Sequence, residues 1–176
     1  HLSGFEGKTA ILGIDGKGEY ATTFFGYGEN GHIHKIKEFY DPDSLGQLYA
    51  SFTEYLGFEM LDGEYKVMGM APYAKEKYFK DIEKKFFQLQ DVKKLRFINK
   101  SKFKDMYFHI KKLLDVKRFD SICGGLQSYS EKLIRKWIVN ILKKNKVNNL
   151  CISGGVALNV KNNLMISKIK GVKNVF

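Results

Sequence analysis

Hydrophobic and polar positions divide the chain into a strand-rich first part and a later part in which helices and strands alternate. An apolar run (8–14), a stretch rich in β-branched and aromatic residues (20–28) and an alternating segment (32–39) are separated by the turn sequences DGKGE and GENG. Such runs, bounded by glycine-containing turn sequences, are typical of β-hairpins. We therefore predict three antiparallel strands joined by two hairpins.

The helical period replaces this pattern from residue 44 onward. One apolar stripe there has helical spacing and consists of Leu45, Leu48, Tyr49, Phe52, Tyr55 and Leu56. Asp43 or Ser44 can cap the start of this helix, and Gly57 can end it. A second helix is predicted over 75–89, and a third over 119–145. The apolar face of the second contains Tyr78, Phe79, Ile82, Phe86 and Leu89. The apolar stripe of the third contains Ile122, Leu126, Tyr129, Leu133, Trp137 and Ile141. Gly124 and Gly125 within it indicate close approach of another backbone or of a ligand.

The last part of the chain predicts a strand over 149–153, a Gly-Gly turn into a helix, and the start of another strand at 172–176. A series of helix, strand, helix and strand is typical of an α/β layer, so the predicted fold class is α/β. Residues 91–118 have the least clear pattern, and we expect a strand at 94–98 followed by a basic insert or a short helix. The segment 62–74, DGEYKVMGMAPYA, contains Gly63, Gly69 and Pro72, which argue against a regular helix.

Length and composition fit one domain of 176 residues with a core, since 44% of the residues are hydrophobic. No apolar run approaches the roughly 20 residues that cross a bilayer, so we expect a cytoplasmic protein without a membrane partner. The first residue is His1 and the chain ends as a strand begins, so we expect a piece of a longer protein.

The formal charge of +11 is unevenly distributed. Residues 1–64 hold 4 lysines and 11 acidic residues, whereas the remaining residues carry a net charge of +18. The excess is lysine, with 27 lysines against 3 arginines. Proteins that read nucleic acids use arginine for bidentate and stacked contacts, so this pattern favours a solvated lysine-rich face over nucleic-acid binding.

Cysteine and histidine offer little chemistry. Cys123 and Cys151 lie in apolar patterns, where a thiol behaves as a small buried hydrophobe. His32 and His34 are two apart on one strand, but no third metal ligand is near them in the sequence, so we interpret them as part of an exposed strand face. For His109 we expect partial packing.

Three glycine-bearing turns carry the candidate chemistry: 15–19 (DGKGE), 62–69 (DGEYKVMG) and 153–159 (SGGVALN). Each has a purely structural explanation, because Asp-Gly suits a hairpin and Gly-Gly suits a turn from strand to helix. Together they also suit a nucleotide site between two lobes, since glycine lets backbone N–H groups approach phosphate oxygens. Neither a P-loop nor a G-x-G-x-x-G fingerprint is present, which argues against kinase-type P-loops and Rossmann cofactors.

Four segments in order, DGKGEYATT, SLGQLYASFTEYLGF, DGEYKVMGMAPY and LCISGGVALN, resemble the O-carbamoyltransferase family, which includes nodulation protein U and the antibiotic carbamoyltransferases. The resemblance covers most of residues 4–176. It implies one incomplete domain of the actin-like ATPase class (ASKHA, ribonuclease H-like), spanning the end of one lobe and the start of the other. It also implies ATP and carbamoyl phosphate as substrates, a carbamoyl-adenylate, and transfer of the carbamoyl group to a hydroxyl of a small-molecule or sugar acceptor.

The resemblance also implies roles for individual residues. Asp15 would bind a metal or help to deprotonate the acceptor, and Lys66 would neutralise phosphate oxygens. Nucleotide contacts would come from Gly16, Gly18, Glu19, Gly63, Glu64, Gly154, Gly155, Val156 and Asn159. Gln127 and Glu131 fall where the long helix of the family meets the cleft.

The family's histidine-rich metal motif would precede His1, and a second Asp-Gly turn and a separate domain would follow Phe176. We therefore expect the fragment to be inactive alone, and we expect a divalent metal (Fe or Mg) to be held mostly by residues outside this chain. The sequence is compatible with a homodimer and does not decide the oligomeric state. The alternatives are a tRNA threonylcarbamoyl-type transferase, which shares the fold and the Gly-Gly-Val-Ala-x-Asn turn, and a non-catalytic basic module that binds nucleic acid.

Overall fold

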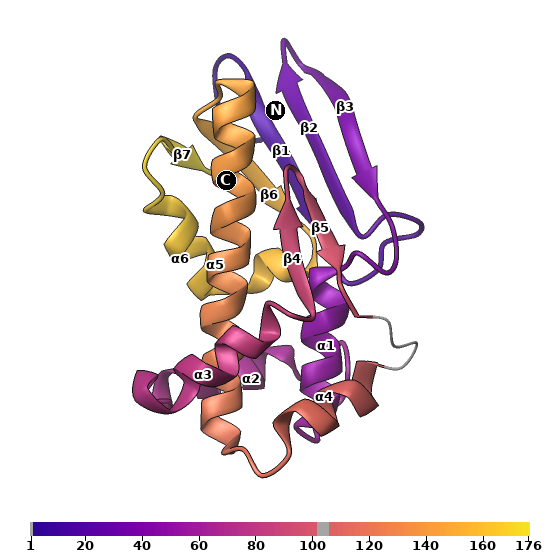
Figure 1. Cartoon of the computed structure of the whole chain (residues 1–176). Coiled ribbons are helices and arrows are strands. Elements are labelled where there is room, and N and C mark those ends of the chain that lie inside the picture. Colours follow the sequence, from indigo (N-terminus) through magenta and orange to yellow (C-terminus); the bar gives the residue numbers. More distant parts are fainter. Residues whose placement is uncertain (1, 102–105) are drawn as a thin grey trace.

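The computed structural model describes residues 2–101 and 106–176. Three antiparallel strands come first, and they confirm the two predicted hairpins: β1 (Thr9–Ile14), β2 (Thr23–Glu29) and β3 (His32–Phe39). Two later strands, β6 (Asn149–Ser153) and β7 (Asn174–Val175), extend the sheet on the other side of β1. β6 pairs parallel with β1, and β7 pairs parallel with β6. The sheet order is therefore β3-β2-β1-β6-β7 (Figure 1).

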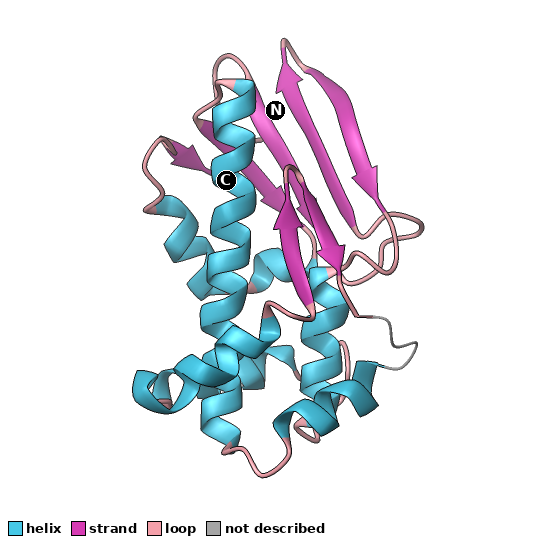
Figure 2. Ribbon diagram, in the orientation of Figure 1, coloured by secondary structure: helices cyan, strands magenta, loops and turns pink. Residues whose placement is uncertain are grey.

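Helices gather mainly at one end of this sheet, and the longest of them continues along it (Figure 2). The α-helices are α1 (Leu45–Tyr55), α2 (Glu64–Met70), α3 (Glu76–Phe86), α4 (Met106–Leu114), α5 (Phe119–Asn145) and α6 (Val160–Ser167). Two 3₁₀ turns, η1 (Ala71–Tyr73) and η2 (Gly155–Leu158), follow α2 and β6. A separate hairpin is formed by β4 (Gln90–Lys93) and β5 (Arg96–Asn99). The described part of the chain thus confirms the α/β fold class.

The core is built around the apolar stripe of α5, and all six residues predicted for that stripe are buried. Trp137 is fully buried, packs on Phe97 with ring centroids 5.1 Å apart, and donates its indole N–H to the Leu95 carbonyl at 2.7 Å. One face of β1 joins the same core through Ala10, Leu12 and Ile14. Helix α5 therefore holds the β4–β5 hairpin and the sheet in one packed unit.

Glycines in α5 permit the close helix packing that the sequence indicates. A Cβ on Gly124 would lie 2.9 Å from Cδ1 of Phe79 and would also overlap Cβ of Ala74. Gly125 faces Phe86 and Glu83 at longer distances. Both glycines thus serve the approach of α5 to the segment that contains η1 and α3.

The structure corrects the prediction for residues 62–74, because this segment is helical. Gly63 precedes α2, and Gly69 within α2 has no atom within 4 Å of the place where its Cβ would stand, so the helix loses no packing there. Pro72 lies in the first turn of η1, where a missing backbone N–H costs no hydrogen bond. Glycine and proline are therefore tolerated because of where they fall within the helical turns.

Two smaller predictions also change. The strand expected at 94–98 is instead the β4–β5 hairpin, in which Lys94 takes a positive φ of 58° at the turn. Tyr78, expected on the packed face of α3, is 48% exposed. The predicted insert after 98 contains α4, and its residues 102–105 lie outside the described residues, as does His1.

Both cysteines are unpaired, and burial raises the pKa of the Cys123 thiol to about 12, which fits the predicted hydrophobic role. His32 and His34 are exposed on β3, as expected, and the ring of His34 stacks on Tyr27 with centroids 4.7 Å apart. Within 2–101 and 106–176, no helix combines the length and the apolar character that crossing a membrane requires.

Candidate functional site

Parallel neighbours β1 and β6 end side by side, and each is followed by one of the predicted glycine turns. Asp15 directly follows β1, and its N–H donates to the Thr22 carbonyl at 2.9 Å, which closes the first hairpin. Gly154 directly follows β6 and leads into η2. Ligands of open α/β sheets bind beyond the carboxyl ends of parallel strands, so this edge is the candidate site.

The two turns are in contact. Gly154 has a φ of +97°, and a Cβ there would lie 2.8 Å from the carbonyl carbon of Ile14 and would also overlap its oxygen. A Cβ on Gly155 would lie 3.0 Å from Oδ1 of Asp15. The same Oδ1 accepts the Gly16 N–H at 2.7 Å. Glycine at 154 and 155 thus leaves the Asp15 carboxylate facing a second backbone turn with no side chain between them.

The N-terminus of α1 packs against the turn that begins at Asp15, here called the Asp15 turn. Ser44 caps α1 by accepting the Gln47 N–H at 3.1 Å, and its hydroxyl lies 3.0 Å from the Asp15 carbonyl and 2.7 Å from the Gly16 carbonyl. Gly46 lies so close that a Cβ there would be 2.6 Å from Cα of Gly16. The start of α1 and the Asp15 turn therefore form one tightly packed unit.

An ion pair anchors this helix start to the β4–β5 hairpin. The side chain of Asp43 is only 5% exposed, accepts Nε of Arg96 at 2.5 Å and the Asn99 N–H at 2.7 Å, and also pairs with Nη2 of Arg96. The Asp43 carbonyl accepts the Thr22 hydroxyl at 3.1 Å. Asp43 thus connects the hairpin, the sheet and α1 next to Ser44.

Replacing Arg96 with alanine is expected to lower the free energy of unfolding by about 2 kcal/mol, because a buried carboxylate loses its charged partner while the Asn99 N–H remains. Chemical denaturation measures this change. Lys84→Ala is the control, since Lys84 pairs with Asp81 at 3.0 Å where both side chains are exposed, and it should cost no more than about 0.5 kcal/mol. Equal losses for the two variants would contradict the anchoring role of Arg96.

A polar network joins α5 to the turn after β6. Nε2 of Gln127 lies 2.7 Å from Oε1 of Glu131 and 3.3 Å from Oδ1 of Asn159, while Nδ2 of Asn159 donates to Oε1 of Gln127 at 2.9 Å. Asn159 also caps α6 by accepting the Asn162 N–H at 3.0 Å. Gln127 and Glu131 therefore lie beside the SGGVALN turn, and Asn159 orients that turn instead of pointing freely to solvent.

Tyr49 on α1 lies near two of the predicted acidic residues. It is buried, and its hydroxyl has no hydrogen-bond partner among residues 2–101 and 106–176. Burial raises the pKa of this phenol well above its ordinary value, and Cys123, Glu64 and Glu131 raise it further. Glu64 and Glu131 are thus close enough to the Tyr49 hydroxyl to act on it electrostatically.

The α2 residues are less well gathered around Asp15. Oε1 of Glu64 accepts the Leu61 N–H at 2.9 Å, and Lys66 is exposed with Nζ 5.6 Å from the ring centroids of Phe58 and Tyr65. Gly63 is buried, and a Cβ there would lie 2.6 Å from Cβ of Phe58. Glu64 thus binds the loop just before its own helix, and Gly63 has a packing role.

The remaining predicted residues lie at the rim of the site. Gly18 and Glu19 are exposed at the tip of the first hairpin, where the Gly18 N–H donates to the Ala21 carbonyl at 3.1 Å, and Val156 is half-buried in η2. Sequence reasoning missed the contacts of Ser44 and Gly46 with the Asp15 turn. A glycine in the first turn of a predicted helix was a signal that could have found them. Across the described ranges, no three His, Cys, Asp or Glu side chains gather to hold a metal ion.

Comparison with known proteins gives a match over the whole chain. The family model described as Carbamoyltransferase N-terminus matches residues 1–176. An uncharacterized protein of Synechocystis is 30% identical over 96% of this chain, and nodulation protein NolNO of Sinorhizobium fredii is 30% identical over 90% of it. Nodulation protein NolO of Bradyrhizobium diazoefficiens is 28% identical over 90% of the chain.

The chain spans only part of these relatives, namely 30%, 24% and 29% of their lengths in the same order. The segments that carry the resemblance in the sequence also form the contacts described above, at the ends of β1 and β6 and at the start of α1. With its entire length matched by the family model, the chain belongs to the carbamoyltransferase family as a form of its N-terminal region.

Proposed function

We propose that this chain forms the nucleotide-binding part of an enzyme that transfers a carbamoyl group from carbamoyl phosphate to a hydroxyl of an acceptor. The reaction depends on ATP and passes through a carbamoyl-adenylate. The observation that supports this most directly is the contact between the Asp15 carboxylate and the Gly154–Gly155 turn at the ends of two parallel strands. The sheet order of three antiparallel strands followed by two parallel ones supports a domain of the actin-like (ASKHA) class.

The residues present fit a nucleotide. Because Gly154 and Gly155 are exposed and lack side chains, phosphates can approach their backbone N–H groups from the solvent side. The start of α6, capped by Asn159, lies just beyond this turn and adds partial positive charge. Gln127 and Glu131 offer an amide and a carboxylate beside Asn159 for the rest of the nucleotide.

Asp15 and Lys66 have different parts in the proposal. The Asp15 carboxylate already holds the Gly16 N–H, which keeps the turn tight and leaves Oδ2 for a hydrated divalent cation that accompanies the phosphates. Lys66 is exposed on α2, and its long side chain supplies a mobile positive charge for phosphate oxygens. Most ligands of a resident metal would come from outside this chain, as would the acceptor site.

Asp15→Asn in the full-length protein is expected to reduce carbamoyl transfer by about 100-fold or more, because asparagine keeps the hydrogen bond to Gly16 but lacks the charge. A radiolabelled carbamoyl group or mass spectrometry of the acceptor measures the rate. Asp115→Asn changes an exposed carboxylate that follows α4 and should leave the rate unchanged. Undiminished transfer by Asp15→Asn, with unchanged thermal stability, would remove Asp15 from the mechanism.

A further inference from the structure

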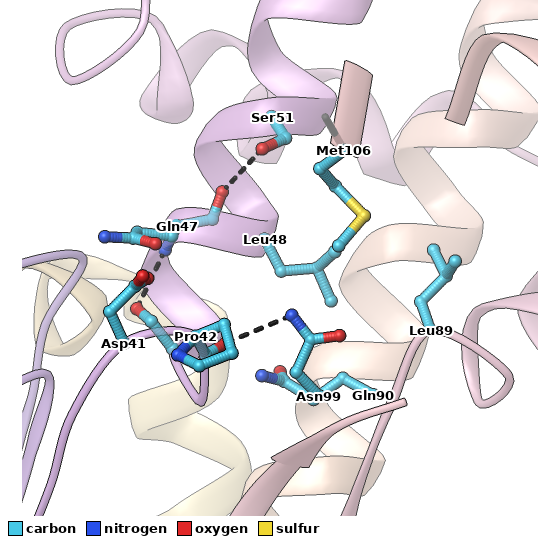
Figure 3. Close-up of a pocket in the computed structure, with 10 residues that line it drawn as sticks. Asp41, Pro42, Gln47, Leu48, Ser51, Leu89, Gln90, Asn99 and Met106 are labelled. Atoms are coloured by element: carbon cyan, nitrogen blue, oxygen red, sulfur yellow. Dashed lines mark hydrogen bonds between the residues drawn. The ribbon is translucent and has the colours of Figure 1, made fainter. Parts of the chain in front are cut away.

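A cavity of about 200 Å³ lies between the start of α1, the β4–β5 hairpin and the start of α4 (Figure 3). The cavity is separate from the Asp15 turn, but Ser44 belongs to both. Ser44 lines the cavity, and its hydroxyl also contacts the Asp15 and Gly16 carbonyls. The hairpin and α4 lie largely within residues 91–118, the segment with the least clear sequence pattern. This segment therefore builds a site with chemistry of its own.

Neutral polar groups dominate one side of the cavity. Amide side chains come from Gln47, Gln90 and Asn99, and a hydroxyl comes from Ser51. The Ser51 hydroxyl donates to the Gln47 carbonyl at 3.0 Å, and Nδ2 of Asn99 donates to the Pro42 carbonyl at 3.2 Å, which holds both side chains in place (Figure 3). These groups present both donors and acceptors, as a ligand with several hydroxyls requires.

Apolar side chains also line the cavity. Leu48, Leu89 and Met106 face the central space together with Asn99 (Figure 3). This mixture of amide and aliphatic groups suits a ligand that carries both hydroxyls and C–H groups. A volume somewhat below the ~300 Å³ at which drug-sized sites begin fits a ligand smaller than a drug.

Gln90 supplies an observation that points to a ligand. Its side chain is 2% exposed and lines the cavity, and its Oε1 accepts no hydrogen bond from any residue in 2–101 or 106–176. Leaving a buried amide acceptor unmatched costs about 1–3 kcal/mol, so a donor from outside the described residues is expected there. A hydroxyl is such a donor.

The described lining of the cavity carries little charge. It contains no lysine, arginine or histidine among the described residues and so offers no cation there to pair with a phosphate or carboxylate. Asp41, which is exposed at the rim, is the ionised group of the described lining and can accept a hydroxyl hydrogen. Nearby Arg96 is paired with the buried Asp43 and is not part of the lining.

We propose that this cavity binds a neutral, hydroxyl-rich small molecule of about the size of one sugar ring. The inference rests on the cavity alone and is independent of carbamoyl transfer. Since Ser44 is shared, the bound molecule would lie directly behind the Asp15 turn.

The test measures binding of methyl α-D-glucopyranoside to the full-length protein by ligand-observed NMR, with inorganic phosphate and putrescine as charged probes. We expect saturable binding of the glucoside, and we expect neither phosphate nor putrescine to compete with it. Gln90→Met should weaken it about tenfold, the equivalent of one hydrogen bond, while leaving thermal stability unchanged or higher because the unmatched acceptor is gone. Gln88→Met, the same change at an exposed position two residues earlier, should leave binding intact.

A second variant tests the cavity by volume. Ser51→Phe should fill it and abolish glucoside binding, whereas Ser167→Phe, at an exposed helical serine whose hydroxyl likewise donates within its own helix, should have no effect. The proposal is overturned if the glucoside fails to bind, which would mean that the cavity holds water only. Displacement of the glucoside by phosphate or putrescine, or equal glucoside binding by Gln90→Met and the unaltered protein, would overturn it as well.

Discussion

Gly154→Ala is expected to lower the free energy of unfolding by about 3 kcal/mol or more and to abolish nucleotide binding. A φ of +97° is unfavourable for any residue with a Cβ. The added Cβ would also stand 2.8 Å from the carbonyl carbon of Ile14, nearer than real Cβ atoms come to other heavy atoms. Since the obstructing atoms belong to the backbone of β1, no side chain can rotate away to relieve the overlap.

Chemical denaturation and nucleotide titration of the full-length protein measure the two effects. Gly171→Ala separates the backbone conformation from the overlap, because Gly171 has a similar φ of +102° but its nearest neighbour would be Cδ1 of Leu142 at 3.7 Å. We expect this control to cost about 1–2 kcal/mol and to leave nucleotide binding unchanged. If both variants lost the same stability, the contact between β1 and the turn after β6 would not constrain the protein.

Elements with a strong local period could be predicted from the sequence. Helix α5 begins and ends at the predicted residues 119 and 145, because its apolar stripe recurs over many turns and faces a single core. The β1–β2–β3 meander was equally accessible, since its turns contain Asp-Gly and Asn-Gly pairs. In both cases the information lies within neighbouring residues.

The pairing of strands that lie far apart in the sequence could not be predicted from local patterns. Ile11 pairs with Cys151 in the parallel register of β1 and β6, across the whole helical part of the chain. Turn chemistry suggested one nucleotide site for DGKGE and SGGVALN, but no local pattern predicted that β1 and β6 end side by side. The prediction for residues 62–74 was wrong because it applied rules for glycine and proline in helix interiors. These rules do not hold for a short helix followed by a 3₁₀ turn.

The candidate site also combines features that local patterns predict with features that depend on tertiary packing. Asp15, Gly154 and Gly155 lie in glycine turns that the sequence singled out and that are in contact in the structure. Lys66, assigned by the resemblance, lies exposed with Nζ 5.6 Å from the ring centroid of Phe58. Ser44 was predicted as a helix cap, and that role is confirmed. Its second role, contacting the Asp15 and Gly16 carbonyls, depends on tertiary packing that a cap pattern does not encode.

Gly46→Ala should have the second large effect, a loss of about 3 kcal/mol of stability together with weaker nucleotide binding. Alanine is the best helix former, so helix propensity alone predicts that this change in the first turns of α1 stabilises the protein by about 1 kcal/mol. The opposite sign is expected because the new Cβ would lie 2.6 Å from Cα of Gly16 and 2.7 Å from the carbonyl carbon of Asp15. Helix α1 must then move away from the turn that it supports.

Gly69→Ala is the matched control, since Gly69 lies within α2 and has no atom within 4 Å of an added Cβ. There the propensity gain is unopposed, and stability should rise by about 0.5–1 kcal/mol with nucleotide binding unchanged. Thermal denaturation of both variants, followed by nucleotide titration, compares the two signs. Stabilisation by Gly46→Ala would mean that α1 and the Asp15 turn can separate without cost, and Ser44 would then hold that turn without help from the helix backbone.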